Sequence, residues 1–406
     1  MKKRYLLFAL FFIAQHIYFA QTSTEIFQLK SDVTILSHDS LEGREIGTSG
    51  EIKAANYIAH RYSELGLKQG NLNSYFQMFT KKQSLHPHDT NFLGPEISGR
   101  NIIGFIDNRA KSNIIIGAHY DHLGWGDEGS LHAGEPMIHN GADDNASGIA
   151  ALLYLAEKLS KKSQDHNYIF IAFTGEEKGL LGSNYFVNNP SFDLNKTSFM
   201  VNMDMVGRLD DERRMAIYGV GTSPSFIPAI NRINDPHFQF KFDSSGIGPS
   251  DHTSFYLNDI PVLHFFTGQH AQYHKPTDDV ELINFDGLND ISHFIYKMII
   301  SLDGENKVKF TKTKEKENTQ LGFKVTLGII PDYLYSDTGL KIDGVKEDRP
   351  AGNAGMLKGD VIIEMGELII HNIDDYMNAL NQFNKGDEIT IKIIRNGNEI
   401  SLKTTF

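Results

Sequence analysis

Apolar runs of strand length alternate with amphipathic stretches over the first three quarters of the chain. The strand-like runs are almost continuously apolar, as expected of strands buried on both faces, and they lie at 113–118, 168–173, 198–204, 215–220 and 260–266. Between them, stretches such as residues 149–162 and 285–302 repeat apolar residues at helical spacing. This alternation predicts an α/β domain with a mostly parallel or mixed central sheet and helices on both faces.

The pattern changes near residue 303. Residues 303–320 are polar and show little apolar periodicity, which predicts a linker. Residues 321–406 then contain short β-like runs, interrupted by one helical stretch at 373–383. Because 406 residues exceed what one hydrophobic core usually holds, we expect a larger domain over 21–302 and a small β-rich domain over 321–406.

The first twenty residues have the layout of a secretory signal. Lys2, Lys3 and Arg4 precede an apolar stretch that is too short for a comfortable membrane span, and the segment ends at Ala20. This layout predicts an exported protein, periplasmic or extracellular. Once the segment is cleaved after Ala20, we expect no stable membrane span. Because Tyr18 is not the small residue expected near such a cut, retention of the segment as an N-terminal anchor is the alternative.

Composition argues against some classes of partner and limits the residue types that can bind a metal ion. With 39 basic and 51 acidic residues the formal net charge is −12, which argues against binding to nucleic acid and against a polybasic membrane patch. The chain has no cysteine, so it forms no disulfide and offers no thiolate to a metal. Any metal ion must therefore be bound by His, Asp and Glu.

Acids and histidines of the ligand type follow the predicted strands directly. They are His119 and Asp121, then Asp143 and Asp144 before a predicted helix, then Glu176 and Glu177, Asp204 and His274. Any one of them is compatible with an ordinary structural role, such as helix capping. Sites in such folds gather at the carboxyl ends of the strands, and burying several carboxylates together without a cation is costly. A pair of divalent metal ions would remove that cost.

Five motifs in this order resemble the co-catalytic two-zinc exopeptidases of metallopeptidase family twenty-eight, which includes secreted bacterial leucine aminopeptidases. They are "AHYDHLG", "GADDNASG", "TGEEKGLLGS", "NMDMVG" and "YHKPTDD". An upstream stretch at 41–67 also looks like that family's N-terminal region, so the resemblance spans roughly 31–302. It implies a zinc-exopeptidase fold with two zinc ions per chain.

The resemblance also implies a ligand set. His119 would bind one zinc together with Asp204, Glu177 and His274 would bind the other, and Asp143 would bridge both.

Three further acids receive roles from the resemblance. Glu176 would be the general base, Asp121 would orient the imidazole of His119, and Asp144 would hold the turn without coordinating. The order of Glu176 as base and Glu177 as ligand comes from the resemblance and not from spacing.

The implied function is that of an exported zinc-dependent aminopeptidase, which hydrolyses N-terminal residues from peptides with water activated by two metals. A metallo-carboxypeptidase or an amidase is the alternative among hydrolases, because the metal core alone does not determine substrate polarity. An inactive peptidase-fold adaptor would be expected to have lost ligands, and all five ligand positions and the base are present.

Residues 348–370 resemble the core signature of PDZ domains of the bacterial type. Such domains bind extended peptides, often protein C-termini, by adding a strand beside a groove. Either 321–323 or 327–330 could form the loop that receives the peptide carboxylate, and we favour Leu327, Gly328 and Ile329. A role in packing or dimerisation is the alternative.

Overall fold

The computed structural model describes most of the chain. The described residues are 22–84, 93–126, 129–132, 134–161, 165–233, 235–305, 307–313, 325–332, 335, 337–345 and 349–406. The predicted signal segment and the candidate loop at 321–323 lie outside them. Within the described ranges, no helix combines the length and the apolar character that crossing a membrane requires.

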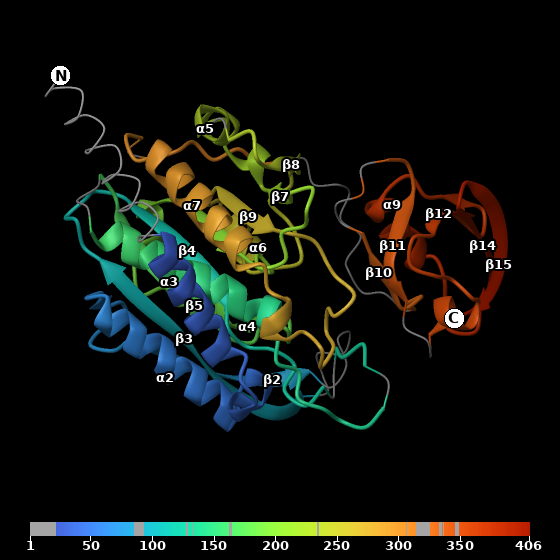
Figure 1. Ribbon diagram of the computed structural model, residues 1–406, viewed down its shortest axis with the longest axis horizontal. Coiled ribbons are helices and arrows are strands. Elements are labelled where there is room, and N and C mark those ends of the chain that lie inside the picture. The colour runs from blue at the N-terminus through green and yellow to red at the C-terminus, as the bar shows by residue number, and fades with distance from the viewer. Residues whose placement is uncertain are drawn as a thin grey trace, which may run out of the picture.

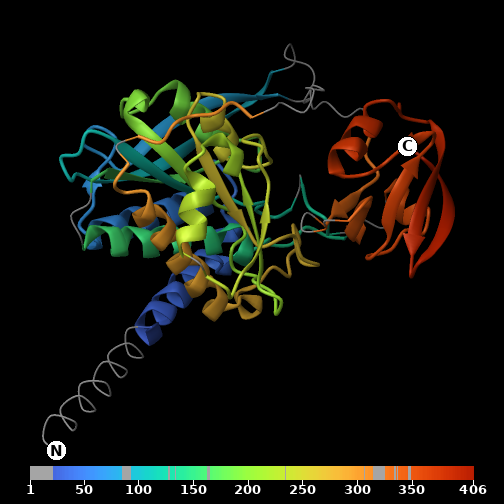
Figure 2. The same ribbon diagram turned by 90° about the horizontal axis from the view of Figure 1, so that it is seen from above.

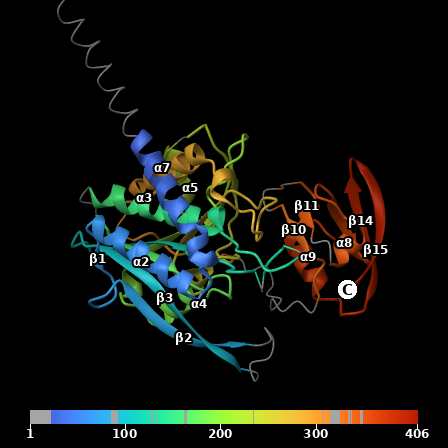
Figure 3. The same ribbon diagram turned by 60° about the horizontal axis from the view of Figure 1, so that its bottom comes forward.

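A nine-stranded mixed sheet forms the centre of the main domain (Figure 1). The strand order is β1-β3-β5-β4-β6-β9-β7-β8, and β2 pairs with β3, beside which it runs along the edge of the domain in Figure 3. The bounds are β1 (Lys68–Gln69), β2 (Phe76–Ser84), β3 (Leu93–Ile106), β4 (Asn113–His119), β5 (Asn167–Phe173), β6 (Thr197–Met203), β7 (Arg214–Tyr218), β8 (Gln239–Phe242) and β9 (Val262–Phe266). The inner strands β5, β4, β6 and β9 pair in parallel, whereas β3 pairs antiparallel with β5, and β7 antiparallel with β9.

Helices cover both faces of this sheet, as predicted. Their bounds are α2 (Ser49–Glu64), α3 (Gly148–Ser160), α4 (Leu181–Asn188), α5 (Phe226–Ile233), α6 (His252–Tyr256) and α7 (Phe285–Ser301), and residues 22–36 are also helical. Short helical turns are η1 (Asp39–Arg44), η2 (Ala142–Ser147), η3 (Leu194–Lys196), η4 (Val220–Thr222) and η5 (Val280–Leu282).

The apolar strand residues explain the two layers, since successive side chains of a strand point to opposite faces. Ile114 and Ile116 pack into the core that α2, α3, α5 and α7 cover, whereas Ile115 packs into the core that α4 and α6 cover. An unbroken apolar run is therefore what a strand with two buried faces requires.

The C-terminal domain is built on a second, six-stranded antiparallel sheet, a separate body in Figure 2. Its elements are β10 (Ile329–Pro331), β11 (Leu340–Val345), α8 (Pro350–Asn353), β12 (Val361–Met365), β13 (Leu368–Ile369), α9 (Ile373–Leu380), β14 (Glu388–Arg395) and β15 (Asn398–Thr405). The strand order β10-β11-β12-β14-β15 leaves β10 at an edge.

The stretch predicted as a linker is partly bound to the main domain. Val308 is buried in the main core, and its N–H donates to Ser198 Oγ (3.0 Å). Thr313 Oγ1 lies 2.8 Å from the hydroxyl of Tyr256. The described residues 307–313 therefore do not form a free tether, because Val308 is buried and Phe310 packs, partly buried, against the second core of the main domain.

Candidate metal centre and active site

Four neighbouring parallel strands bring the predicted site residues to one edge of the sheet. His119 is the last residue of β4, and its register partner on β5 is Phe173, three residues before Glu176. Asp204 directly follows β6, and His274 lies in the loop after β9. Because these strands run in the same direction, their carboxyl ends meet at one rim.

Asp144 lies between the two histidines. Its Oδ1 is 3.4 Å from Nε2 of His119, and its Oδ2 is 3.3 Å from Nε2 of His274. On the first side, Asp204 Oδ1 is 3.2 Å from His119 Nε2. On the second side, Glu177 Oε2 is 3.2 Å from His274 Nε2. The structure therefore contains two groups of donor atoms that share one carboxylate.

Asp143 does not take the bridging place that the sequence predicted for it. Its Oδ1 accepts hydrogen bonds from the N–H of Gly207 (2.7 Å) and the hydroxyl of Ser147 (2.9 Å), and its Oδ2 faces His270 Nε2 at 3.3 Å. The two adjacent acids thus exchange their predicted places: Asp143 holds the turn, and Asp144 faces the histidines. Residues within η2 depart from helical geometry, so periodicity does not reveal which of the two points into the site.

The donor set fits metal ions of the zinc type. Nδ1 of His274 donates to the carbonyl of Gly129 (2.9 Å), and Nδ1 of His119 donates to the carbonyl of Asp121 (3.2 Å). Each imidazole that is protonated at Nδ1 presents the lone pair of Nε2 to carboxylate oxygens, which repel it unless positive charge lies between them. Imidazole nitrogens and carboxylate oxygens are common zinc ligands, and histidine ligands usually donate their other ring N–H in this way.

The electrostatics of the site favour cations. Burial alone would lower the pKa of His119, but the carboxylates of Asp204 and Glu176 raise it well above its ordinary value. Burial would also lower the pKa of His274, but the carboxylates of Glu177 and Asp144 raise it well above its ordinary value. The same negative potential that retains a proton on each imidazole would attract a divalent ion in its place.

The main chain of Glu176 is hydrogen-bonded to the side chain of Asp121. The N–H of Glu176 donates to Asp121 Oδ1 (3.2 Å), and that oxygen lies 3.7 Å from Nδ1 of His119. Glu176 also offers a carboxylate oxygen in a cluster with donor atoms of His119 and Asp204, all within 4.8 Å of one another. The geometry by itself therefore allows Glu176 to be either a ligand or a base.

Sequence reasoning underestimated three residues near the site. His122, which follows Asp121 in "AHYDHLG" and had no role assigned from the sequence, has Nδ1 at 2.9 Å from Glu177 Oε1. Asp278 Oδ2 accepts the N–H groups of Asp143 and Asp144 (2.9 and 3.1 Å). His270, not assigned from the sequence, faces Asp143. His122 and Asp278 belong to the motifs "AHYDHLG" and "YHKPTDD", and His270 lies just before the second, so position in the sequence was the only signal for these contacts.

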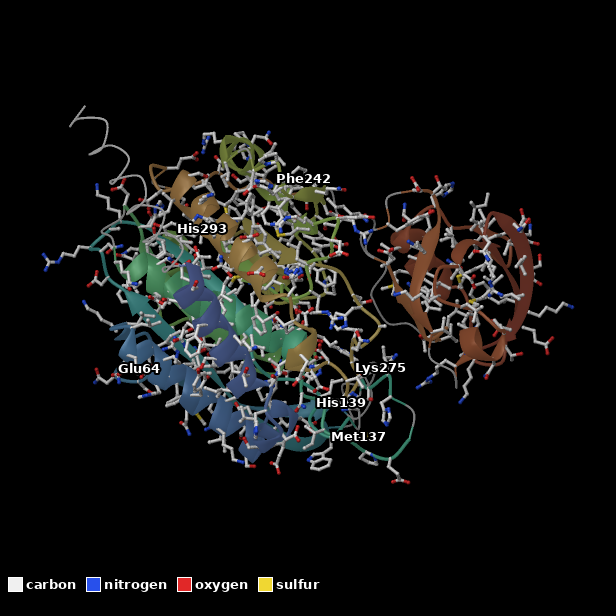
Figure 4. The ribbon with its side chains drawn as sticks, in the orientation of Figure 1. Glu64, Met137, His139, Phe242, Lys275 and His293 are labelled. Atoms are coloured by element: carbon white, nitrogen blue, oxygen red, sulfur yellow. The ribbon has the colours of Figure 1, made fainter. Side chains whose placement is uncertain are left out.

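A cavity opens onto these side chains. It is lined by four acids, by an apolar and aromatic group, and by other polar residues: Asp144, Glu176, Glu177 and Asp204; Met205, Tyr218, Pro249, Phe266 and Tyr273; His119, His264, Gln269 and His274. The loop of Lys275, which carries the lining residues Tyr273 and His274, lies beside the loop of His139 in Figure 4. The N–H of Leu131 donates to the carbonyl of His274 (2.9 Å), which joins the two loops.

The candidate peptide-binding residues lie at the entrance to the edge strand of the second sheet. Leu327 is buried, and its carbonyl accepts the N–H of Ala351 (2.9 Å). Gly328 has a left-handed φ of 73°, and a Cβ there would come within 2.3 Å of Arg349. Ile329 begins β10. Position 328 thus requires glycine. The turn leads directly into β10, an edge strand of the sheet in the part of the chain that the structure describes.

Models of two protein families match separate parts of the chain. A model described as peptidase family M28 matches residues 101–299, and a PDZ domain model matches residues 308–406. "Probable leucine aminopeptidase 2" of Arthroderma benhamiae is 28% identical over 270 residues, covering 59% of this chain and 51% of that protein. The chain spans about half the length of the curated relatives that it matches.

Two solved structures show the same fold at low sequence identity. An aminopeptidase from Aneurinibacillus sp. strain AM-1 superposes with a TM-score of 0.55 at 17% identity, covering 71% of this chain and 95% of that one. A glutaminyl cyclase from Porphyromonas gingivalis gives a TM-score of 0.53 at 17% identity, covering 68% of this chain and 97% of that one. The fold is therefore shared by more than one chemistry, and the site residues have to discriminate between them.

Proposed function

Since the main domain belongs to peptidase family M28 and the C-terminal domain is a PDZ domain, we propose that this protein is an exported zinc-dependent aminopeptidase. The observation that carries the proposal is the carboxylate of Asp144, whose two oxygens face His119 and His274 at 3.4 and 3.3 Å. A shared carboxylate between two sets of donors is the arrangement that a pair of metal ions requires.

We assign two zinc ions per chain to these donors. His119 and Asp204 would hold one ion, Glu177 and His274 the other, and Asp144 would bridge them. When bound, the ions supply Lewis-acid polarisation to a substrate carbonyl and to water.

Glu176 is the proposed general base. Its carboxylate lines the cavity beside His119 and Asp204, and its main-chain N–H is held by Asp121. Glu177, in contrast, is engaged on both oxygens, by His122 at Oε1 and by His274 at Oε2. The less engaged acid is the one free to take a proton from attacking water and pass it to the leaving amine.

Cleavage at the N-terminus follows from the free amine and from shape. Three of the four acids that line the cavity would be zinc ligands, so bound ions would offset their charge, and the amine of a free peptide N-terminus would approach the metal centre as a neutral group. The apolar and aromatic lining residues accommodate the side chain of the first residue. An N-blocked peptide has no free amine to offer and is expected to be a poor substrate.

The test is a substrate panel with the zinc-loaded protein. Aminoacyl chromogenic substrates should be cleaved, whereas the same substrates with an acetylated N-terminus should be cleaved at least a hundredfold more slowly. Equal rates on both would refute the aminopeptidase assignment, and cleavage from the C-terminus would identify a carboxypeptidase. In parallel, Glu176→Gln should retain two zinc ions and lose activity; full activity with zinc bound would refute its role as base.

For the C-terminal domain, the proposed partner is an extended peptide with a free C-terminus. Such a peptide would add a strand to the open edge of β10, with its carboxylate near Leu327, Gly328 and Ile329. Binding of fluorescent peptides should be abolished by Gly328→Val, because a side chain there collides with Arg349. Amidated peptides serve as the control, and equal binding of the acid and amide forms would argue against carboxylate recognition.

A further inference from the structure

Arg44 is buried beneath the site without a carboxylate among its hydrogen-bond partners. It ends η1 and is 1% exposed, and among the described residues it is the only lysine or arginine that is buried. Its guanidinium donates to four main-chain carbonyls, those of Leu36, Tyr120, Asn140 and Gly141. Burying a cation is costly, so a buried arginine with only neutral acceptors requires a reason.

Three of these carbonyls belong to the segments that carry site residues. Nε donates to Tyr120 O at 2.7 Å, in the residue directly after His119. Nη1 donates to Asn140 O at 2.7 Å and Nη2 to Gly141 O at 3.0 Å, just before η2. One planar side chain therefore fastens the end of β4 to the turn that carries Asp144.

Gly141 transmits this restraint to Asp144. Its φ of 55° is left-handed, and a Cβ built on it would lie 2.1 Å from the carbonyl oxygen of Asp144. The main chain at Gly141 is thus packed directly against that of Asp144. A shift of Gly141 and of its carbonyl, to which Arg44 donates, would therefore displace the main chain that carries the carboxylate of Asp144.

The charge of Arg44 also acts on the site. Burial lowers its pKa to about 10, against the opposing effect of the Asp121, Asp144, Asp278 and Glu177 carboxylates, so it remains protonated at neutral pH. A fixed positive charge behind several acids reduces their mutual repulsion without occupying their oxygens. The carboxylates of Asp144 and Glu177 stay available to line the cavity.

We propose that Arg44 is a positioning residue of the metal centre, which holds the His119 and Asp144 segments in register and offsets the repulsion between the site acids. The inference rests on the zinc site of the proposed function. Arg44 lies outside residues 101–299, the part matched by the peptidase model, so the N-terminal region would contribute to metal binding from behind the sheet rim.

A matched control variant distinguishes a positioning role of Arg44 in the metal centre from a merely structural role. Arg61 in α2 belongs to the same N-terminal region and pairs with Asp32 (Nε to Oδ1, 3.0 Å) and Glu64 (Nη1 to Oε2, 3.0 Å), neither of which is a site residue. Arg44→Met and Arg61→Met each remove a guanidinium and keep an unbranched apolar side chain. Both should lower the midpoint of chemical unfolding, but only the first should affect zinc.

The readout is zinc affinity, measured on the full chain by competition with a chromophoric chelator. Arg44→Met should weaken binding at least tenfold, as expected for residues that orient metal ligands, while Arg61→Met stays within twofold of wild type. The proposal is overturned if Arg44→Met binds zinc as tightly as wild type, or if Arg61→Met weakens binding equally. Failure of the wild type to bind zinc would instead refute the proposed function.

A second variant covers the case in which Arg44→Met does not fold. Arg44→Lys keeps the charge, but a single ammonium group cannot reproduce the rigid fork that reaches carbonyls of both segments. It should weaken zinc binding at least threefold. An affinity equal to that of the wild type would overturn the positioning role.

Discussion

Substitution of the two adjacent acids of η2 discriminates directly between the bridging and the turn-holding residue. Asp144→Asn leaves a side chain of the same shape with one carbonyl oxygen and one NH2 group. That side chain can no longer present an oxygen both to His119 at 3.4 Å and to His274 at 3.3 Å, and it loses the negative charge. We expect one of the two zinc ions to be lost.

The kinetic magnitude follows from the charge stabilisation that the pair of ions supplies. If losing one ion removes about 4 kcal/mol of transition-state stabilisation, kcat/KM falls by about 1,000-fold. Asp143→Asn should behave differently, because its amide oxygen can still accept from Gly207 and Ser147. The loss is the charge assistance of these two hydrogen bonds and of the contact between Oδ2 and His270, about 1 kcal/mol each, and it falls on stability more than on activity.

The assay combines elemental analysis with kinetics. After dialysis against metal-depleted buffer, Asp144→Asn should contain one zinc or fewer per chain, while Asp143→Asn retains two and loses no more than about tenfold in kcat/KM. The opposite pattern, a single zinc in Asp143→Asn and normal activity in Asp144→Asn, would refute the structural assignment and restore the one made from the sequence. Equal loss in both variants would show that neither acid alone bridges.

Three further outcomes can be measured. Removing zinc with a chelator should lower the thermal midpoint of the main domain by about 10 °C, since a ligand at 1,000 times its Kd contributes about 4 kcal/mol, and the C-terminal domain should not respond; an unchanged midpoint would argue against a tightly bound ion. His122→Phe removes the 2.9 Å contact to Glu177 at nearly constant ring size and should lower zinc affinity, with His132→Phe as an off-site control; equal affinities would show that His122 only packs. Val308→Ala should destabilise the main domain by about 1–2 kcal/mol in chemical unfolding because Val308 is buried in its core, and no change would indicate that residues 307–313 detach in solution.

The strand pattern was predictable because burial on both faces imposes it locally. The apolar runs at 113–118 and 168–173 correspond to β4 and β5, and the helical stretches at 149–162 and 285–302 to α3 and α7. Periodicity also identified the change of architecture near residue 303. It could not show that Val308 returns to the main core, because a single valine in a polar segment has no periodicity.

The candidate ligand residues and their order along the chain could be named from the sequence, because the carboxyl ends of parallel strands meet at one rim and the segments after those strands carry acids and histidines. Which atom of which acid faces the cavity was decided only by tertiary structure. Asp143 and Asp144 are chemically identical neighbours, and their directions depend on the non-helical turn of η2, which includes Ser147, and on Gly207 and Asp278, which arrive from distant parts of the chain. Arg44 shows the same limit, since its partners at 36, 120 and 140–141 are main-chain carbonyls, whose chemistry is common to every residue and leaves no trace in the sequence.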